Sequence, residues 1–104
     1  MSYQIIFDEI ILNQLKKLGE KEKIRTILSK MFDKIEMLGP RAGKLVDSQL
    51  FIYEIKSKSP PIRLYFKHKR DSNNIYVFEY ELKTSSDKQN KTVNKLRDKS
   101  QRLF

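Results

Sequence analysis

The sequence contains no cysteine, no tryptophan and a single histidine, His68. Without cysteine the chain has no disulfide, thiolate nucleophile or zinc–thiolate centre, and that composition fits a cytoplasmic protein. One histidine also argues against an all-protein transition-metal site, so we predict no metal and no other cofactor. No apolar run approaches ~18 residues, and the N-terminal segment MSYQIIFDEI is acidic where a signal peptide is basic, so we expect no membrane span and no secretion signal.

Positive charge is abundant and unevenly distributed along the chain. The formal net charge is +9 over 104 residues, a length that suits a single domain covering residues 1–104. Residues 1–54 carry nine Lys or Arg against eight Asp or Glu, whereas residues 55–104 carry thirteen against five. Such a one-sided excess favours a polyanionic partner, chiefly nucleic acid or the ribosome, over a merely solubilising surface.

The first half of the sequence predicts a short strand and two helices. SYQIIF has the β-branched and aromatic content of a strand, and Asp8 is placed to cap a helix that ends near Leu18 and Gly19. A second helix is indicated by apolar residues at helical spacing, and Gly39-Pro40 ends it. These apolar positions are Ile24, Ile27, Leu28, Met31, Phe32, Ile35 and Leu38.

The second half changes to a period of two after the predicted loop GPRAGKLVDSQ. Three strands are expected at Leu50–Lys56, in IRLYFKHK and at Ile75–Lys83, joined by the polar turns SKSPP and RDSNN as an antiparallel meander. In the last strand, alternation puts Tyr76, Phe78, Tyr80 and Leu82 on one face and Glu79 and Glu81 on the other. The tail predicts a basic helix that Ser86 caps, with Gln89 completing a capping box. Because it has few apolar positions, this helix is expected either to dock weakly or to serve as a binding element for a partner.

The predicted fold class is therefore α+β, with the element order β-α-α-β-β-β followed by a C-terminal helix. An N-terminal strand and a helical hairpin pack on a small antiparallel sheet. The opposite face of that sheet is expected to be partly open and basic.

Four segments in this order resemble the RelE/ParE toxin superfamily of toxin–antitoxin systems, most closely its HigB-like, phage-derived branch. They are LGPRAGKL, FIYEIK, IRLYF and LKT, and together they extend from the second helix to the last strand. The resemblance implies a RelE-like fold and a cytoplasmic toxin that an acidic antitoxin inhibits, for which a small helix-turn-helix protein is one candidate. It further implies a metal-independent endoribonuclease (an mRNA interferase) that binds the ribosome, cleaves mRNA there and so inhibits translation.

Arg63 is the leading candidate for the catalytic site. RNA cleavage without a metal uses the adjacent 2′-hydroxyl as nucleophile, and an arginine fork meets two oxygens of the developing phosphorane at once. Arg63 lies mid-strand in IRLYF and matches the sheet arginine of the family; the alternative is a structural pair with Glu54 or Glu79. Lys56 and Lys83 are further candidates for phosphate or proton-transfer work, with Lys58 as an RNA contact.

His68 is the remaining candidate for proton transfer, because only histidine has an ordinary pKa near neutrality. Lys67, Lys69 and Arg70 surround it and are predicted to bind RNA phosphates, and Tyr65 is a candidate for stacking on a base.

Two departures from the family pattern keep other functions open. Leu82 stands where relatives have the first of two basic residues, and Phe78 stands where many have a histidine. The alternatives are a ParE-like toxin that inhibits DNA gyrase, or a relative that binds nucleic acid without catalysis.

Overall fold

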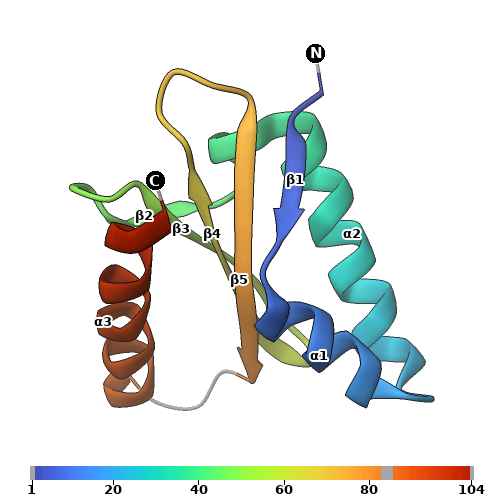
Figure 1. Ribbon diagram of the computed structural model, residues 1–104. Coiled ribbons are helices and arrows are strands. Elements are labelled where there is room, and N and C mark those ends of the chain that lie inside the picture. Colours follow the sequence, from blue (N-terminus) through green and yellow to red (C-terminus); the bar gives the residue numbers. More distant parts are fainter. Residues whose placement is uncertain (1, 83–85, 104) are drawn as a thin grey trace.

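A computed structural model of the chain describes residues 2–82 and 86–103 (Figure 1). Asp8 caps the first helix as predicted, because its Oδ2 accepts a hydrogen bond of 2.8 Å from the backbone N–H of Ile10. Gly39 ends the second long helix in a conformation with φ of +61°, which glycine adopts without steric cost. The helices are α1 (Glu9–Leu18), α2 (Glu22–Leu38), the short 3₁₀ helix η1 (Gly39–Ala42) and α3 (Ser86–Leu103).

The sheet has five strands in the order β1-β5-β4-β3-β2. The predicted meander is confirmed, since β3, β4 and β5 pair antiparallel, and the N-terminal strand lies at an edge, where it pairs parallel with β5. The other edge strand, β2, falls inside the segment that was predicted to be a loop, so that part of the prediction was wrong. The strands are β1 (Gln4–Phe7), β2 (Lys44–Asp47), β3 (Ile52–Lys58), β4 (Pro61–His68) and β5 (Asn74–Leu82).

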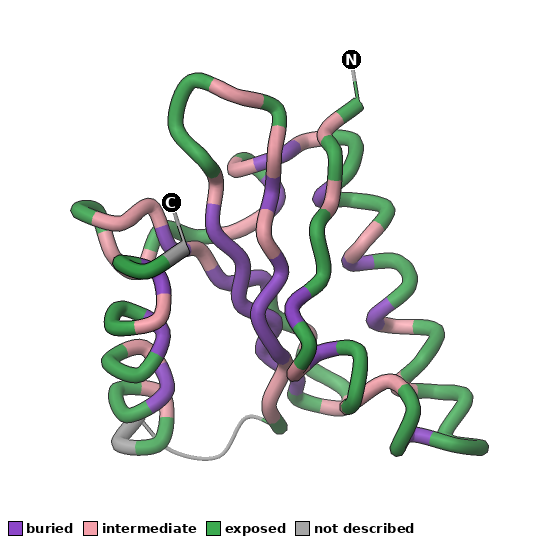
Figure 2. The backbone as a smooth tube through the Cα atoms, in the orientation of Figure 1, coloured by how far each residue is buried: buried purple, intermediate pink, exposed green. Residues whose placement is uncertain are grey.

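Both faces of the sheet are covered, which gives three layers (Figures 1 and 2). The helices α1 and α2 lie on one face over the larger core, which includes the fully buried Ile11, Leu28 and Phe66. The helix α3 lies on the other face and buries Leu96 completely in a smaller cluster with Ile52, Tyr65 and Phe78. The second face is therefore not open, as the sequence had suggested, because α3 occupies it.

An irregularity in β5 overturns the predicted alternation of its side chains. Tyr65 pairs with Glu79 and Phe66 pairs with Val77, so Phe78 is skipped in the register. Such a bulge places two successive residues on the same face. Phe78 accordingly packs in the cluster beneath α3, on the side where Glu79 contacts that helix, whereas Tyr80 packs against the core on the α1–α2 side.

Gly43, between η1 and β2, is expected to tolerate no side chain. A Cβ atom at this position would overlap the backbone carbonyl of Glu54 and approach the Phe66 ring to 2.9 Å. Both neighbours are held inside the sheet, so we expect Gly43→Ala to lower the free energy of unfolding by about 2–3 kcal/mol in urea titrations. Gly19→Ala is the matched control, since no atom lies within 4 Å of its Cβ position and only its φ of +55° costs energy, about 1 kcal/mol. Equal effects of the two substitutions would contradict this account.

Candidate functional site

Arg63 lies in the middle of β4 on the face that α3 covers. Only 7% of its surface is exposed, and its Nε lies 3.9 Å from Oε2 of Glu54, a residue that is itself 4% exposed. Neither Nε nor Nη1 of Arg63 has a hydrogen-bond partner among the described residues. A buried guanidinium normally has its donors satisfied, so this arginine retains binding capacity that the fold does not use.

The strand register surrounds Arg63 with charged and polar side chains. Directly across the strands, Arg63 lies between Lys56 of β3 and Glu81 of β5. In the neighbouring row, Tyr65 lies between Glu54 and Glu79 in the same way. Three carboxylates therefore stand on the sheet face that carries the arginine, which makes that face more acidic than the charge of the second half of the chain predicts.

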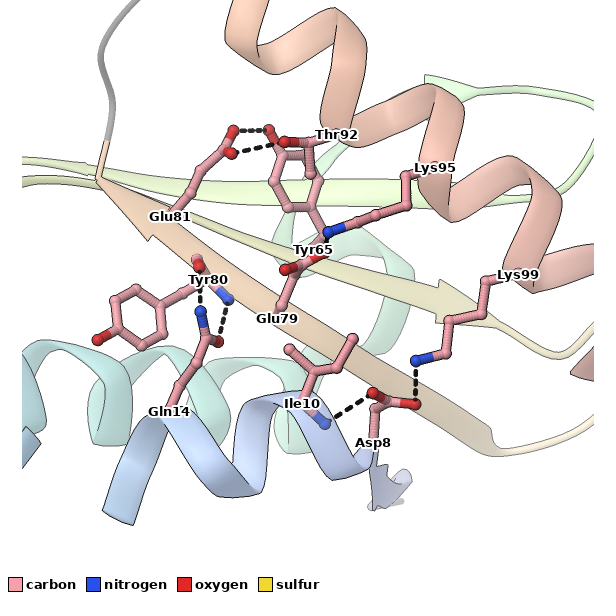
Figure 3. A network of polar contacts seen from close by, with 10 residues as sticks. All are labelled: Asp8, Ile10, Gln14, Tyr65, Glu79, Tyr80, Glu81, Thr92, Lys95 and Lys99. Carbon is pink, nitrogen blue, oxygen red and sulfur yellow. Dashed lines mark hydrogen bonds and ion pairs between the residues drawn. The ribbon is translucent and has the colours of Figure 1, made fainter. Parts of the chain in front are cut away.

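Two uncharged side chains of α3 bind these carboxylates from above. Gln89 donates from Nε2 to Oε2 of Glu54 at 2.7 Å, and Thr92 donates its hydroxyl to Oε2 of Glu81 at 2.7 Å. The other oxygen of Glu81 accepts the hydroxyl of Tyr65 at 2.6 Å (Figure 3). Burial, followed by this hydrogen bond and the charge of Glu81, raises the pKa of Tyr65 far above its ordinary value. Tyr65 is therefore a permanent hydrogen-bond donor to Glu81.

Ion pairs fix the rest of α3 to the sheet and to the start of α1. Lys95 contacts Oε1 of Glu79 at 2.6 Å and Lys99 contacts Oδ1 of Asp8 at 2.7 Å (Figure 3). At the β2 edge, Arg97 lies 2.7 Å from Asp47. Six of the chain's Lys and Arg residues belong to α3, and the sheet face beneath that helix supplies the carboxylates that they contact. The prediction that the sheet face itself is basic was therefore wrong.

Asp8 provides a test of how these contacts stabilise the protein. Burial alone would raise the pKa of Asp8, but hydrogen bonds from Lys99, Tyr76 and the Ile10 backbone together hold it below its ordinary value of 3.8. A carboxyl whose pKa falls on folding stabilises the fold above its unfolded pKa and loses that contribution as the pH drops through the folded one. We expect Asp8→Asn to cost about 1–2 kcal/mol at neutral pH, and the difference from wild type to vanish in acid well below pH 3.8.

Urea unfolding at a series of pH values measures this effect. Asp33→Asn, at an exposed position of α2, is the matched control and is expected to change the unfolding free energy little at any pH. A loss for Asp8→Asn that stays constant down to the lowest pH would contradict the assignment.

Comparison with solved structures relates this arrangement to known proteins. A chain in the crystal structure of the intact E. coli RelBE toxin–antitoxin complex superposes with a TM-score of 0.64 and 26% identity, over 81% of this chain and 100% of that one. A mutant of the E. coli toxin RelE in the free state gives a TM-score of 0.69 and 25% identity, over 91% of this chain and 98% of that one. The chain has the RelE fold. No protein-family model and no curated protein sequence matches it.

A further RelE structure, a mutant in complex with a peptide of the antitoxin RelB, gives a TM-score of 0.66 and 24% identity over 88% of this chain. These similarities support the RelE superfamily and confirm the predicted fold class. The narrower placement in the HigB-like branch stays a prediction, because the solved structures compared above are RelE toxins.

Within the RelE fold, the predicted site residues fall into two separate groups. Lys56 and Arg63 face each other on β3 and β4, with Lys58 exposed at the same end of the sheet. His68 lies five residues further along β4, about 16 Å away at the rise of a strand. There it is part of a turn, with Nε2 at 2.8 Å from the carbonyl oxygen of Ser72. The sheet therefore does not bring His68 to the arginine.

The residues around His68 are occupied with the loops at that end. Lys67 is 6% exposed, and its ammonium donates to the carbonyl oxygen of Leu50 at 2.6 Å, a position that does not fit a surface contact to phosphate. Burial lowers the pKa of Lys67. Arg70 lies over the ring of Phe51, 5.4 Å from its centre, and Lys69 is exposed. The role of Lys69 and Arg70 as RNA contacts stays a prediction.

Two further candidates from the sequence are Tyr65, for stacking on a base, and Lys83, for contact with a phosphate. Tyr65 is fully buried, so in this conformation it offers no face for a base to stack on. Lys83 lies outside the described residues; the described part of β5 ends at Leu82, which pairs with Ile62 beside Arg63.

Gln89 and Thr92 were missed at the sequence level as polar residues of the site, whereas Glu54 and Glu81 were both named there. The two glutamates carried a signal, because an acidic residue in the middle of an apolar strand is costly to bury unless it has a partner. Gln89 and Thr92 carried none, since nothing in the tail predicts which face of the helix meets the sheet.

No group of three or more histidine or acidic residues with the geometry of a metal site occurs in the described part of the chain. Over the same residues, no helix is both long and apolar enough to cross a membrane.

Proposed function

We propose that this protein is the toxin of a toxin–antitoxin system and a metal-independent endoribonuclease that cleaves ribosome-bound mRNA. The observation that carries the proposal is a RelE fold whose central strand holds Arg63 with two guanidinium nitrogens that have no hydrogen-bond partner among the described residues. An arginine kept only for structure would be expected to have its donors satisfied.

In the proposed reaction, the ribose 2′-hydroxyl attacks the adjacent phosphorus and the 5′-oxygen of the next nucleotide leaves. The guanidinium of Arg63 stabilises the phosphorane, on which an additional negative charge develops. Lys56 adds positive charge directly across from Arg63. Lys83 is proposed as a further phosphate contact. The net charge of +9 attracts the polyanionic substrate and its ribosomal surroundings over a longer range.

The position of α3 sets a requirement for this reaction. Arg63 is 7% exposed beneath the helix, and a phosphate cannot reach it while α3 is docked. The proposed enzyme therefore acts only in a state in which the N-terminal half of α3 has moved away from β3 and β4. Leu96 and Val93 are the described residues of α3 in the apolar cluster, so the movement is expected to cost less free energy than global unfolding.

The proposed partners are the ribosome, its mRNA and a cognate antitoxin. E. coli RelE occurs with the antitoxin RelB in two of the similar structures, which supports an antitoxin for this chain as well. The acidic antitoxin segment expected from the sequence would meet the exposed cations of α2, because Lys95 and Lys99 of α3 are already paired with Glu79 and Asp8.

Induced expression in a bacterial host, followed by primer extension, tests the proposal. We expect growth arrest together with new 5′ ends on a translated message, and none on the same message without its start codon. Arrested growth with intact messages and induced DNA-damage signalling would replace the proposal with a gyrase-directed toxin. Normal growth with intact messages would leave a relative that binds nucleic acid without cutting it.

A further inference from the structure

Glu81 is the carboxylate on the α3-covered face whose environment differs from that of its neighbours. It stands directly across from Arg63 in the β4–β5 register. Glu54 lies beside the charge of Arg63, and Glu79 is paired with Lys95. Glu81 has two hydroxyl groups as its hydrogen-bond partners and no ion pair among the described residues. A carboxylate that pairs with no cation remains available as an acceptor for a hydroxyl group of a substrate.

The two oxygens of Glu81 have different roles in this arrangement. Oε1 is fixed from within the sheet by Tyr65, a fully buried side chain on the strand that carries Arg63. Oε2 faces α3 and accepts the hydroxyl of Thr92 at 2.7 Å (Figure 3). Thr92 bears a secondary alcohol, which is the same functional group as a ribose 2′-hydroxyl. When α3 moves, the place of that alcohol beside Oε2 becomes available.

We propose that Glu81 is the general base of the ribonuclease and that the Thr92 hydroxyl occupies the position of the substrate 2′-hydroxyl while α3 is docked. This inference rests on the function proposed above. Oε2 removes the 2′-proton, the bond from the 2′-oxygen to phosphorus forms, and the bond from phosphorus to the 5′-oxygen breaks. The proton returns from Glu81 through water to the leaving 5′-oxygen. The products are a 2′,3′-cyclic phosphate and a 5′-hydroxyl, and the enzyme ends unchanged.

Tyr65 acts in this scheme as a positioning residue. Its hydroxyl holds Oε1, so the carboxylate keeps its orientation after Thr92 has left. Arg63 then faces the phosphate from the strand position opposite Glu81. Base and phosphorane-stabilising cation thus come from adjacent strands of a rigid sheet, which is the geometry that proton transfer coupled to phosphoryl attack requires.

The alternative role for Glu81 is to anchor α3 through Thr92. The two roles predict different effects of substitution. An anchor is disrupted equally from either side, so Glu81→Gln and Thr92→Val would behave alike. A general base is lost only in Glu81→Gln, whereas Thr92→Val removes the competing hydroxyl and leaves the base in place.

The experiment measures single-turnover cleavage of mRNA on purified ribosomes by the full-length protein, over a range of pH. Charged and titratable groups near Glu81 are Glu54, Arg63, Tyr65, Glu79 and Lys95, so Glu79→Gln serves as the control for loss of one charge on the same strand face. We expect Glu81→Gln to lower the rate at least ~100-fold and to abolish the fall of activity in acid. Glu79→Gln and Thr92→Val are expected to cleave within about threefold of wild type, because neither side chain takes part in the proposed proton transfer.

Glu81→Asp guards against a variant that fails to fold. It retains a titrating carboxylate one methylene shorter, so it is expected to cleave slowly while keeping the acid limb of the pH profile. Cleavage by Glu81→Gln at the wild-type rate, or with the wild-type pH profile, would overturn the assignment of Glu81 alone. Equal cleavage rates in Thr92→Val and Glu81→Gln would overturn it in favour of the anchor. Wild-type protein that cleaves nothing would instead contradict the proposed ribonuclease itself.

Discussion

Replacing Arg63 with methionine is expected to abolish most cleavage while leaving the protein folded. Removing a cation from a developing phosphorane costs at least ~100-fold in rate, as for other preorganised electrostatic groups. The guanidinium is 7% exposed with two nitrogens unsatisfied, so the fold gains little from its charge. Removing one member of a tight buried ion pair costs about 3–5 kcal/mol, because the other charge is left uncompensated. The 3.9 Å separation of Arg63 from Glu54 and the hydrogen bond from Gln89 to Glu54 keep the expected cost below that range.

Two measurements on the same variants test this expectation. Cleavage of ribosome-bound mRNA gives the rate, and urea unfolding gives the stability. Arg63→Lys is the matched control because it keeps a charge but loses the planar fork, and we expect an intermediate rate. A large loss of stability in Arg63→Met, with cleavage reduced only in proportion to the unfolded fraction, would show that Arg63 serves the Glu54 pair instead of a phosphate.

Truncating Leu96 is expected to have the largest effect on the docking of α3. Its side chain is fully buried with Ile52, Tyr65 and Phe78. Among the described apolar residues of α3, Leu96 alone is fully buried. Leu96→Ala should lower the free energy of unfolding by about 2–4 kcal/mol, the range for removal of a buried leucine. Because α3 has few other apolar contacts, we expect the amides of α3 in Leu96→Ala to exchange with deuterium much faster than the amides of β4 and β5 in the same variant.

Val93→Ala, at a half-buried position in the same cluster, is the control for Leu96→Ala. It should shift both the stability and the exchange rates by less than half as much. Uniform acceleration of exchange across the whole protein, with no preference for α3, would contradict the view that this helix is a separately docked layer.

The elements that depend on local sequence pattern were predictable. The second helix follows from seven apolar residues at helical spacing and a terminating glycine, and the meander follows from period-two alternation between polar turns. The strand β2 was missed because its sequence, KLVD, is short and lies between Gly43 and the turn at residues 48–51. It becomes a strand only by pairing with β3, a tertiary interaction that no local pattern encodes.

The sequence was sufficient to predict Arg63 as a site residue, but not to predict which side chains surround it. Arg63 attracts notice as a cation in an apolar strand, and Glu54 was named as its structural alternative on the neighbouring strand. Which carboxylates share its face depends on the bulge at Phe78, since a shift of one residue sends every later side chain of β5 to the other face. Alternation alone placed Phe78 with Tyr80, and the structure separates them.

Charge counted along the chain also misled the interpretation of the second face. The excess of cations in residues 55–104 is real, but much of it resides in a helix that folds back onto the sheet. Lys95 and Lys99 then neutralise Glu79 and Asp8 instead of extending a basic surface. A count along the sequence gives the size of the charge, whereas the docking of α3 decides where it acts.

The central claim, that this protein is a ribonuclease acting through Arg63, is tested most directly with purified components. Ribosomes paused on a defined mRNA are incubated with the wild-type protein or with Arg63→Met, and the 5′ ends of the RNA are mapped by primer extension. The account predicts cleavage within the ribosome-bound region by the wild type, none on free mRNA, and a rate at least ~100-fold lower for Arg63→Met. Intact ribosome-bound mRNA with the wild type, or equal cleavage by both proteins, would contradict it.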